Sequence, residues 1–534
     1  MTPSSIRRRP RRAPTHISVR VAHTLLGGVI AVLWLVWPGL TASSSSDRPA
    51  ALPSTAPTPG AAAQEEGEET STADLVLPLV ALGTAAVLAA YTHVRRTRRA
   101  RTRTTPGGPA SAPDPGSAHS LDRLDEQARA LLVEADDCVR ASGEELAAAG
   151  ATSAPQKLEH FALAVREAQW ELSAAFAIRQ RYDDGVPAET SARRQALAGI
   201  VGRCTEAGRR LDAEAPAFDA VRGLDRDVGA ALEAAETRFR EVAARTSTAG
   251  ATLAALGGRY AATACAPVVG HVEQAKDRLV FTTFHLNQAR QAADLADPRR
   301  AAAHLRAAEA ATDQSATFGA AVERLAGELS TAERLTGAAL TGAEVEIAGA
   351  RERVAKAAGG EALAGIPAGE LTSRLMHADA VLAAVRETLT GGPYDPLDAL
   401  RRVVRAVAPV SVERAGVLAV AGELVARSTT AGAADFVATH RGAVGAEART
   451  RLATARRLLT EDPLAADALA RTALHLAEQD VRVHGTPASG TSPHADGVGG
   501  ALLGGVLLGG DPAPGPPAGF GGPGSRARRN FPLS

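Results

Sequence analysis

The sequence is poor in aromatic residues and in lysine. Phe, Trp and Tyr together make up 3% of the 534 residues, and the lysines are Lys157, Lys276 and Lys356. Alanine and arginine, both strong helix formers, are abundant instead. Because runs of β-branched and aromatic residues are scarce, sheets are not expected. We predict a mainly α protein whose antiparallel helices, arranged as a bundle or coiled coil, pack through small Ala and Leu side chains and must be long to bury enough area.

Cysteine is also rare. Cys138, Cys204 and Cys265 are far apart, odd in number and without a CxxC pair, which argues against a disulfide framework and against a zinc site. All three fall on helices that we expect to be cytoplasmic, where thiols stay reduced. We therefore interpret them as small buried apolar residues.

The sequence lacks the common catalytic signatures. It contains no GxxxxGK[ST], GxSxG or HExxH motif. His440 resembles a phosphoacceptor histidine, but no nucleotide-binding domain follows it, and we interpret it as a helix-surface residue capping a turn near Gly442. His271 and His285 share a helix face and would bind a metal only with carboxylates from another helix. We predict no catalytic, cofactor-binding or metal-ligating residues, no cofactor, and no enzyme activity.

Two long apolar runs stand out against this background. Val21–Leu40 and Leu75–Val94 are each 20 residues long, which as a helix spans roughly 30 Å, the thickness of the bilayer core. Arginines crowd before the first run and after the second, whereas residues 41–74 are acidic. The positive-inside rule then places both arginine blocks in the cytoplasm. The net charge of the chain is zero, but its excess of positive charge is concentrated in these two blocks. Anionic membrane lipids account for the arginines there, so nucleic acid is not an expected partner.

This pattern predicts an ordered series of segments at the plasma membrane. Residues 1–42 are a signal peptide or a retained signal anchor, and both alternatives stay open. The further segments are an extracytoplasmic disordered stretch (43–73), a transmembrane helix (74–94), a basic juxtamembrane linker (95–120), a cytoplasmic helical or coiled-coil region (121–484) and a Gly/Pro-rich tail without fixed structure (485–534).

Helical periodicity is clearest in one stretch of the 121–484 region. Spacings of three and four residues alternate without a miss through Val272, Ala275, Leu279, Thr282, Leu286, Ala289 and Ala293. This is the seam of a coiled-coil-like helix and requires a partner helix, from the same chain or from a second copy. Ala448, Leu452, Ala455 and Leu459 repeat the spacing.

Asp-Pro pairs mark helix starts. They occur at Asp297-Pro298, Asp395-Pro396 and Asp462-Pro463, and Asp is a good N-cap while Pro fits the first helical position. Residues 289–314 and 455–479 look alike around two of these pairs, so each is predicted to form a helical hairpin. The unequal spacing of the pairs argues against a regular solenoid.

A few bulky side chains are expected to anchor the small-residue core. The candidates are Phe161, Trp170, Phe176, Phe281 and Phe284. Phe161 and Phe176 lie about four helical turns apart and therefore share a helix side. An aromatic-lined ligand pocket is the alternative to plain core packing.

Several long segments resemble a known family. The stretches at 271–292, 394–403, 436–459 and 475–482, with the glycine-rich GGALLGGVLLGG and the final FGGPGSRARRNF, resemble the cytoplasmic region of actinobacterial TPM-domain membrane proteins. In that family a signal peptide precedes an extracytoplasmic α/β TPM domain, one span and the helical region. Here the segment between the apolar runs is too short for a domain with its own core. The resemblance therefore implies a family member from which the TPM domain is absent.

These observations favour a membrane-anchored helical interaction or scaffold protein. Its partner would be another protein, or a second copy bound through the Val272, Leu279 and Leu286 seam. The alternative is a cell-envelope enzyme or regulator of the phosphatase-like TPM type, whose TPM domain is missing from this chain or supplied by another.

Overall fold

The computed structural model describes residues 116–356, 367–411, 416–484 and 519–525. The predicted signal peptide or anchor (1–42), extracytoplasmic stretch (43–73) and transmembrane helix (74–94) lie outside these residues, as does most of the predicted linker. Among the helices in the described ranges, none combines the length and the apolar character needed to cross a bilayer.

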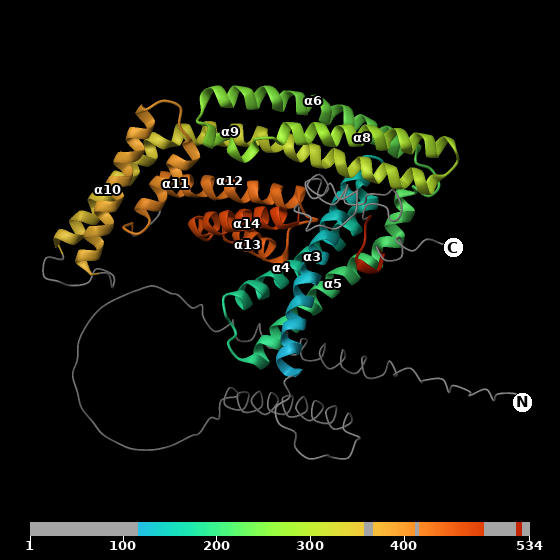
Figure 1. Ribbon diagram of the computed structural model, residues 1–534, viewed down its shortest axis with the longest axis horizontal. Helices are drawn as coiled ribbons and strands as arrows, with labels where there is room; N and C mark the ends of the chain where they lie inside the picture. The colour runs from blue at the N-terminus through green and yellow to red at the C-terminus, as the bar shows by residue number, and fades with distance from the viewer. Residues whose placement is uncertain (1–115, 357–366, 412–415, 485–518, 526–534) are drawn as a thin grey trace, which may run out of the picture. The chain divides into compact units, whose positions relative to one another are not determined.

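The described part of the chain is mainly α, as the composition predicts, and contains no strand. Its elements, in chain order and shown in Figure 1, are α3 (Gly116–Gly150), α4 (Pro155–Asp183), α5 (Thr190–Arg222), α6 (Gly229–Arg259), α7 (Ala262–Cys265), the 3-10 helix η1 (Ala266–Val268), α8 (His271–Asp294), α9 (Pro298–Lys356), α10 (Ala368–Thr390), α11 (Pro396–Val407), α12 (Val417–Thr439), α13 (Ala446–Leu458) and α14 (Pro463–His484). α3 begins inside the predicted 95–120 linker, so the helical region starts earlier than expected. α14 ends at the position predicted for the end of that region.

All three Asp-Pro pairs begin helices, as predicted. The carboxylates of Asp297, Asp395 and Asp462 each accept a hydrogen bond from the backbone N–H three residues later, over 3.0–3.2 Å. The two predicted hairpins are present, as the packed pairs α8–α9 and α13–α14. A short-range signal thus fixes where α9, α11 and α14 start.

The periodic seam of α8 packs against α9 and α6 of the same chain. Five of its seven positions are buried, but Leu279 and Ala293 are only half-buried. The neighbouring Arg278 and Ala292 are buried in their place. A straight α-helix has 3.6 residues per turn, so the buried face drifts away from a strict 3.5-residue repeat.

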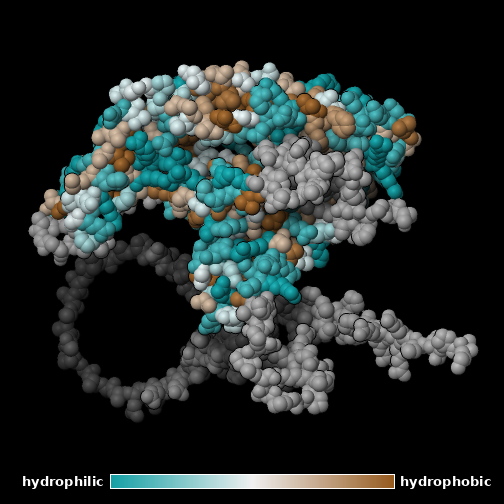
Figure 2. Space-filling view, viewed as in Figure 1, coloured by the Kyte–Doolittle hydropathy of each residue, from teal (hydrophilic) through white to brown (hydrophobic). Residues whose placement is uncertain are grey.

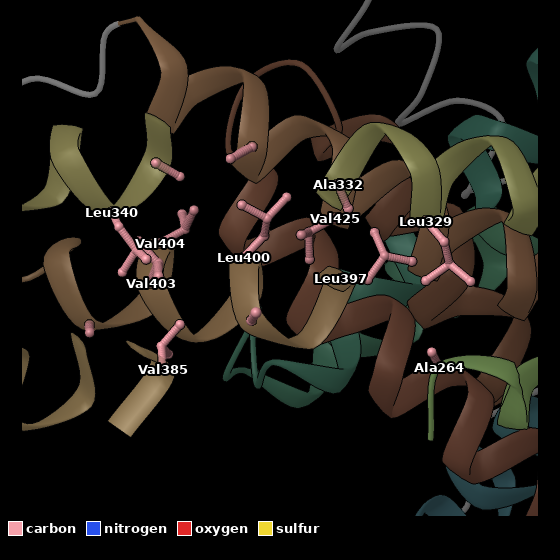
Figure 3. Packing of buried hydrophobic residues seen from close by; sticks show 14 of the residues in the cluster. Ala264, Leu329, Ala332, Leu340, Val385, Leu397, Leu400, Val403, Val404 and Val425 are labelled. Atoms are coloured by element: carbon pink, nitrogen blue, oxygen red, sulfur yellow. The ribbon is translucent and has the colours of Figure 1, made fainter. Parts of the chain in front are cut away.

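The longest described helix, α9, links two of the hydrophobic clusters. Its N-terminal part contributes Ala301 and Leu305 to a cluster with α6, α8 and the residues that follow α5. Its later part contributes Leu329 and Leu340 to a cluster with α7, α10, α11 and α12, part of which is shown in Figure 3. Alanine and leucine are the commonest residues of both clusters, which agrees with the expected packing through Ala and Leu side chains.

The predicted aromatic anchors are right in part. Phe161 and Phe176 are buried in one cluster of α3, α4 and α5, on the shared side that their spacing predicts. Trp170 and Phe284, by contrast, are 65% and 57% exposed, and Phe281 is half-buried. Trp170 lies on the outer face of α4, where the Arg203 guanidinium covers its ring at 5.7 Å, so cation–π contact replaces core packing.

Residues 519–525 differ from the expectation of a tail without fixed structure, while the rest of that tail lies outside the described residues. Phe520 is fully buried among Phe161 and Phe218. The Gly/Pro content of the tail suggested that it had nothing to bury, but one aromatic side chain is enough where a pocket already exists.

Candidate functional site: an arginine-lined cavity

A cavity of about 650 Å³ opens between α3, α4 and α13. Its floor is apolar and includes Val139, Leu172 and Phe176. Its polar rim is dominated by positive charge. Three arginines and one aspartate are the charged residues that line it, Arg140 and Asp136 from α3 and Arg456 and Arg457 from the last turn of α13.

The position of α13 beside α3 is set by a buried ion-pair cluster. Arg449, whose side chain is 2% exposed, contacts Asp136 at 2.6 Å and Asp137 at 2.8 Å. It also donates hydrogen bonds to the carbonyl oxygens of Val444 and Arg441. The two carboxylates raise the pKa of Arg449 although burial opposes this. Asp136 is therefore already engaged by Arg449 and does not neutralise the cavity arginines alone.

One of the cavity arginines, Arg140, has a buried donor without a partner, whereas Arg456 beside it is exposed. The Nε of Arg140 is buried and has no hydrogen-bond partner. Burial lowers the pKa of Arg456, the nearby charge of Arg140 lowers it further, and the carboxylates of Asp136 and Asp435 offset only part of this. A buried unpaired donor costs about 1–3 kcal/mol, and more when it is charged. An anion bound between the two guanidinium groups would accept a hydrogen bond from the Nε of Arg140 and reduce the repulsion between the two charges.

The chemistry of this arrangement favours carboxylate or phosphate. Guanidinium groups present paired N–H donors that match the two oxygens of such groups. Gln169, Ser173 and Thr454 add polar groups to the same walls, while Thr454 is held by hydrogen bonds to Gln180 and to the carbonyl of Thr450. The apolar floor would receive the carbon part of an acidic side chain.

His440 does not lie on a helix surface as predicted. It is the C-cap residue of α12, and it is 2% exposed. Its ring stacks on Phe436 with centroids 4.2 Å apart, and its Nδ1 lies 3.0 Å from the Phe436 carbonyl oxygen. Burial lowers its pKa to about 4. The prediction of a position at a helix end is confirmed, but the ring turns inward against neighbouring helices.

His271 and His285 are not brought together. His271 packs edge-on against Phe318 of α9, whereas Nδ1 of His285 lies 2.9 Å from Nδ1 of His304. Burial lowers the pKa of both His271 and His285 to about 4. Within the described ranges, no three His, Cys, Asp or Glu side chains are grouped so as to hold a metal ion. That the protein uses no metal or cofactor stays a prediction.

The three cysteines are buried and form no disulfide, as the sequence predicts. Burial raises the pKa of the Cys204 thiol to about 12 and also raises that of Cys265. A thiol is a good nucleophile only as the thiolate. Burial therefore disfavours the thiolate form of Cys204 and Cys265, which agrees with a packing role for these two residues.

Little in the sequence pointed to the cavity arginines. They come from two segments more than 300 residues apart, and arginine is so common in this chain that no single one stands out. Acidic neighbours in the sequence give no signal either. Arg140 has Asp136, Asp137 and Glu144 three or four residues away, and Arg457 has Glu461 four residues later, whereas Arg456 has no acidic residue at these spacings.

Comparison with known proteins shows similarity to curated mycobacterial sequences. No protein-family model and no solved structure matches the chain. Two curated proteins of Mycobacterium tuberculosis match it, UPF0603 protein MT2410 of strain CDC 1551 / Oshkosh and UPF0603 protein Rv2345 of strain ATCC 25618 / H37Rv. Each is 28% identical over 358 residues, which is 64% of this chain and 53% of the relative. The chain thus spans about half the length of these curated relatives and is similar to a UPF0603 protein.

Proposed function

We propose that this chain is a membrane-anchored helical interaction protein, and that its helical region holds an acidic segment of a partner protein in the arginine-lined cavity. We also propose that the chain belongs to the TPM-domain-containing proteins, on the resemblance described above. The observation that carries the proposed binding of an acidic segment is the buried, unpaired Nε of Arg140, in a cavity that two further arginines line.

The surface supports recognition through charge. On the face shown in Figure 2, hydrophobic residues form small separate patches within a mainly hydrophilic surface. Extended apolar patches are typical of large permanent interfaces. A concave site with a few oriented guanidinium groups suits a smaller partner segment, held by a few charge-assisted hydrogen bonds.

The test measures binding of a fluorescent oligoglutamate peptide to the full chain in mild detergent. Arg140→Gln and Arg456→Gln each remove one charged donor group. A charged hydrogen bond contributes about 1.5–3 kcal/mol, so each variant is expected to bind about tenfold more weakly or worse. Rising salt should weaken the wild-type complex, because the interaction is ionic.

A matched control is Arg427→Gln. Arg427 is an exposed helix arginine, 62% accessible and paired with Glu423 of its own helix, so its loss should leave the peptide affinity unchanged. Equal affinities of the wild type and both cavity variants would overturn the proposal. Displacement of the peptide by low concentrations of inorganic phosphate would show that the cavity takes a small anion and not a protein segment.

The enzymatic alternative has a different signature. It needs a TPM domain from elsewhere, so the purified full chain should gain phosphatase-like turnover only when such a domain is added. We assign no catalysis to the helices. Turnover that appears on addition of the domain, and that is lost in Arg140→Gln, would favour the alternative.

A further inference from the structure

A short segment near the C-terminus is inserted between α3, α4 and α5. The ring of Phe520 stacks on Phe218 of α5, with centroids 4.4 Å apart, and meets Phe161 of α4 edge-on at 5.8 Å. All three phenylalanines are fully buried. The buried rings pack in the arrangements that aromatic side chains prefer, which adds to the gain from burial alone. Phe520 is thus the anchor of the segment.

The residues after Phe520 bind through their backbone. One carboxylate oxygen of Asp212 accepts hydrogen bonds from the N–H groups of Gly522 and Ser525, at 3.0 and 2.7 Å, and the other accepts one from Gly524 at 3.0 Å. The N–H of Gly521 donates to the Ser142 hydroxyl at 3.1 Å. A carboxylate that collects three backbone N–H groups recognises a turn of the chain, not a particular side chain.

Close approach of two backbones makes this recognition selective for glycine. A Cβ at Gly522 would collide with the carbonyl oxygen of Gly208 in α5, and no substitution could relieve this without moving a backbone. A Cβ at Gly208 would in turn lie 2.7 Å from the Pro523 ring. Both partners of the contact therefore require glycine, one on the helix and one on the segment.

Helix α5 also contains a proline next to the bound segment. Pro216 lies inside α5, one turn after Asp212, and proline has no N–H to donate to the carbonyl four residues earlier. Ala215 lies against the segment, 3.1 Å from where a Cβ of Gly521 would be. The residues that build the groove are Ser142, Phe161, Gly208, Asp212 and Phe218.

The groove is separate from the arginine-lined cavity. None of its five residues lines that cavity. A function of the groove is therefore independent of the function proposed for the cavity, and each can fail without the other.

We propose that this groove is a peptide-binding site for segments of the type Phe-Gly-Gly-Pro-Gly-Ser, and that the C-terminal segment of a second copy of the chain can fill it in place of the resident one. All specific contacts described above fall within Phe520–Ser525, so binding does not require the rest of the donor chain. Residues 485–518 join the segment to α14 and could reach up to roughly 110 Å. The groove of a neighbouring copy is then within reach of the same segment.

The first experiment uses the full chain with Gly522→Val, which blocks insertion of its own segment and leaves every groove residue intact. A fluorescent peptide with the sequence of residues 516–527 should bind this variant. The same peptide with Phe520→Ala should bind at least tenfold more weakly, because it lacks the anchor. Adding Asp212→Ala to the receptor should weaken binding by a similar factor. The wild-type chain should bind weakly, since its resident segment competes at high effective concentration.

The second experiment tests exchange between copies. A chain with Asp212→Ala has a damaged groove and an intact segment, whereas the Gly522→Val chain has the reverse. Their mixture should form a one-to-one dimer by light scattering, and either variant alone should stay at its starting mass. A peptide that binds while the mixture forms no dimer would restrict the site to its own chain and refute the exchange.

Two outcomes would overturn the whole proposal. One is equal affinity of the peptide with and without the Phe520→Ala change. The other is absence of peptide binding by a Gly522→Val chain with unchanged far-UV circular dichroism. If Gly522→Val does not fold, the Phe520→Ala chain serves as the receptor, because it also vacates the pocket and leaves α3, α4 and α5 unchanged in sequence.

Discussion

Replacing Arg449 by methionine tests whether the ion pairs between α13 and α3 stabilise the fold. The side chain of Arg449 is almost fully buried, and its Nη1 atom contacts carboxylates of both Asp136 and Asp137. Methionine retains much of the volume but removes the charge and every hydrogen bond. The carboxylates of Asp136 and Asp137, which are 17% and 23% exposed, then remain in a largely buried place and lose their contact with Arg449.

The expected loss is large because the remaining charges are not fully solvated. Removal of one partner from a buried ion pair costs about 3–5 kcal/mol. The partial exposure of the aspartates places the expected value at the lower end, about 3 kcal/mol. Adding Asp136→Asn and Asp137→Asn to the Arg449→Met chain should recover most of this loss, because the two negative charges that Arg449 balanced are then also removed.

The free energy of unfolding is measured by urea denaturation, followed by far-UV circular dichroism at near-neutral pH. Arg427→Met is the matched control, because this exposed pair with Glu423 should contribute less than about 1 kcal/mol. The reasoning is refuted if Arg449→Met loses no more than the control, or if the triple variant is less stable than Arg449→Met alone.

Three further predictions follow from particular residues. Burial lowers the pKa of His440 from 6.5 to about 4, so its contribution to the free energy of unfolding is present above pH 6.5 and is lost as the pH falls toward 4. His440→Leu should reduce this acid-dependent loss by about 3 kcal/mol, which urea denaturation at several pH values in that range would measure. Asp462→Ala removes the bond from the Ala465 N–H and should lower the unfolding free energy by about 1 kcal/mol, whereas no change in urea denaturation would mean that the cap is redundant. Leu286→Asp should lower the free energy of unfolding by about 2 kcal/mol or more beyond Leu279→Asp, because Leu286 is 5% exposed and Leu279 is half-buried. Equal melting temperatures of the two variants would contradict the packing described for α8.

The parts of the fold that depend on nearby residues could be predicted from the sequence. The Asp-Pro pairs act over three residues, and all of them begin helices where expected. The α8 seam was found from spacing alone, and its failures at Leu279 and Ala293 are shifts to adjacent positions. Such features depend on local hydrogen bonds and on helical pitch, which can be read directly from the order of the residues.

The parts that depend on distant residues could not be predicted. Trp170 was expected in the core because of its size, but which face of α4 turns inward depends on where α3 and α5 lie. The arginine-lined cavity joins α3 to α13 across most of the described chain. The inserted Phe520 meets residues some 300 positions earlier. Composition described the surrounding tail correctly as glycine-rich, but it carried no information about the pocket that receives one side chain.

The continuity of α9 has a consequence for how the protein unfolds. Its 59 residues would extend over about 88 Å as one straight helix, and they supply side chains to two separate hydrophobic clusters. Neither cluster can melt without exposing apolar surface on a helix that the other still holds. Heat should therefore disrupt both in a single cooperative step. A proline at Ala316, between the α9 residues of the two clusters, would weaken this coupling, while α6 and α8, which also contribute to both clusters, would still maintain part of it.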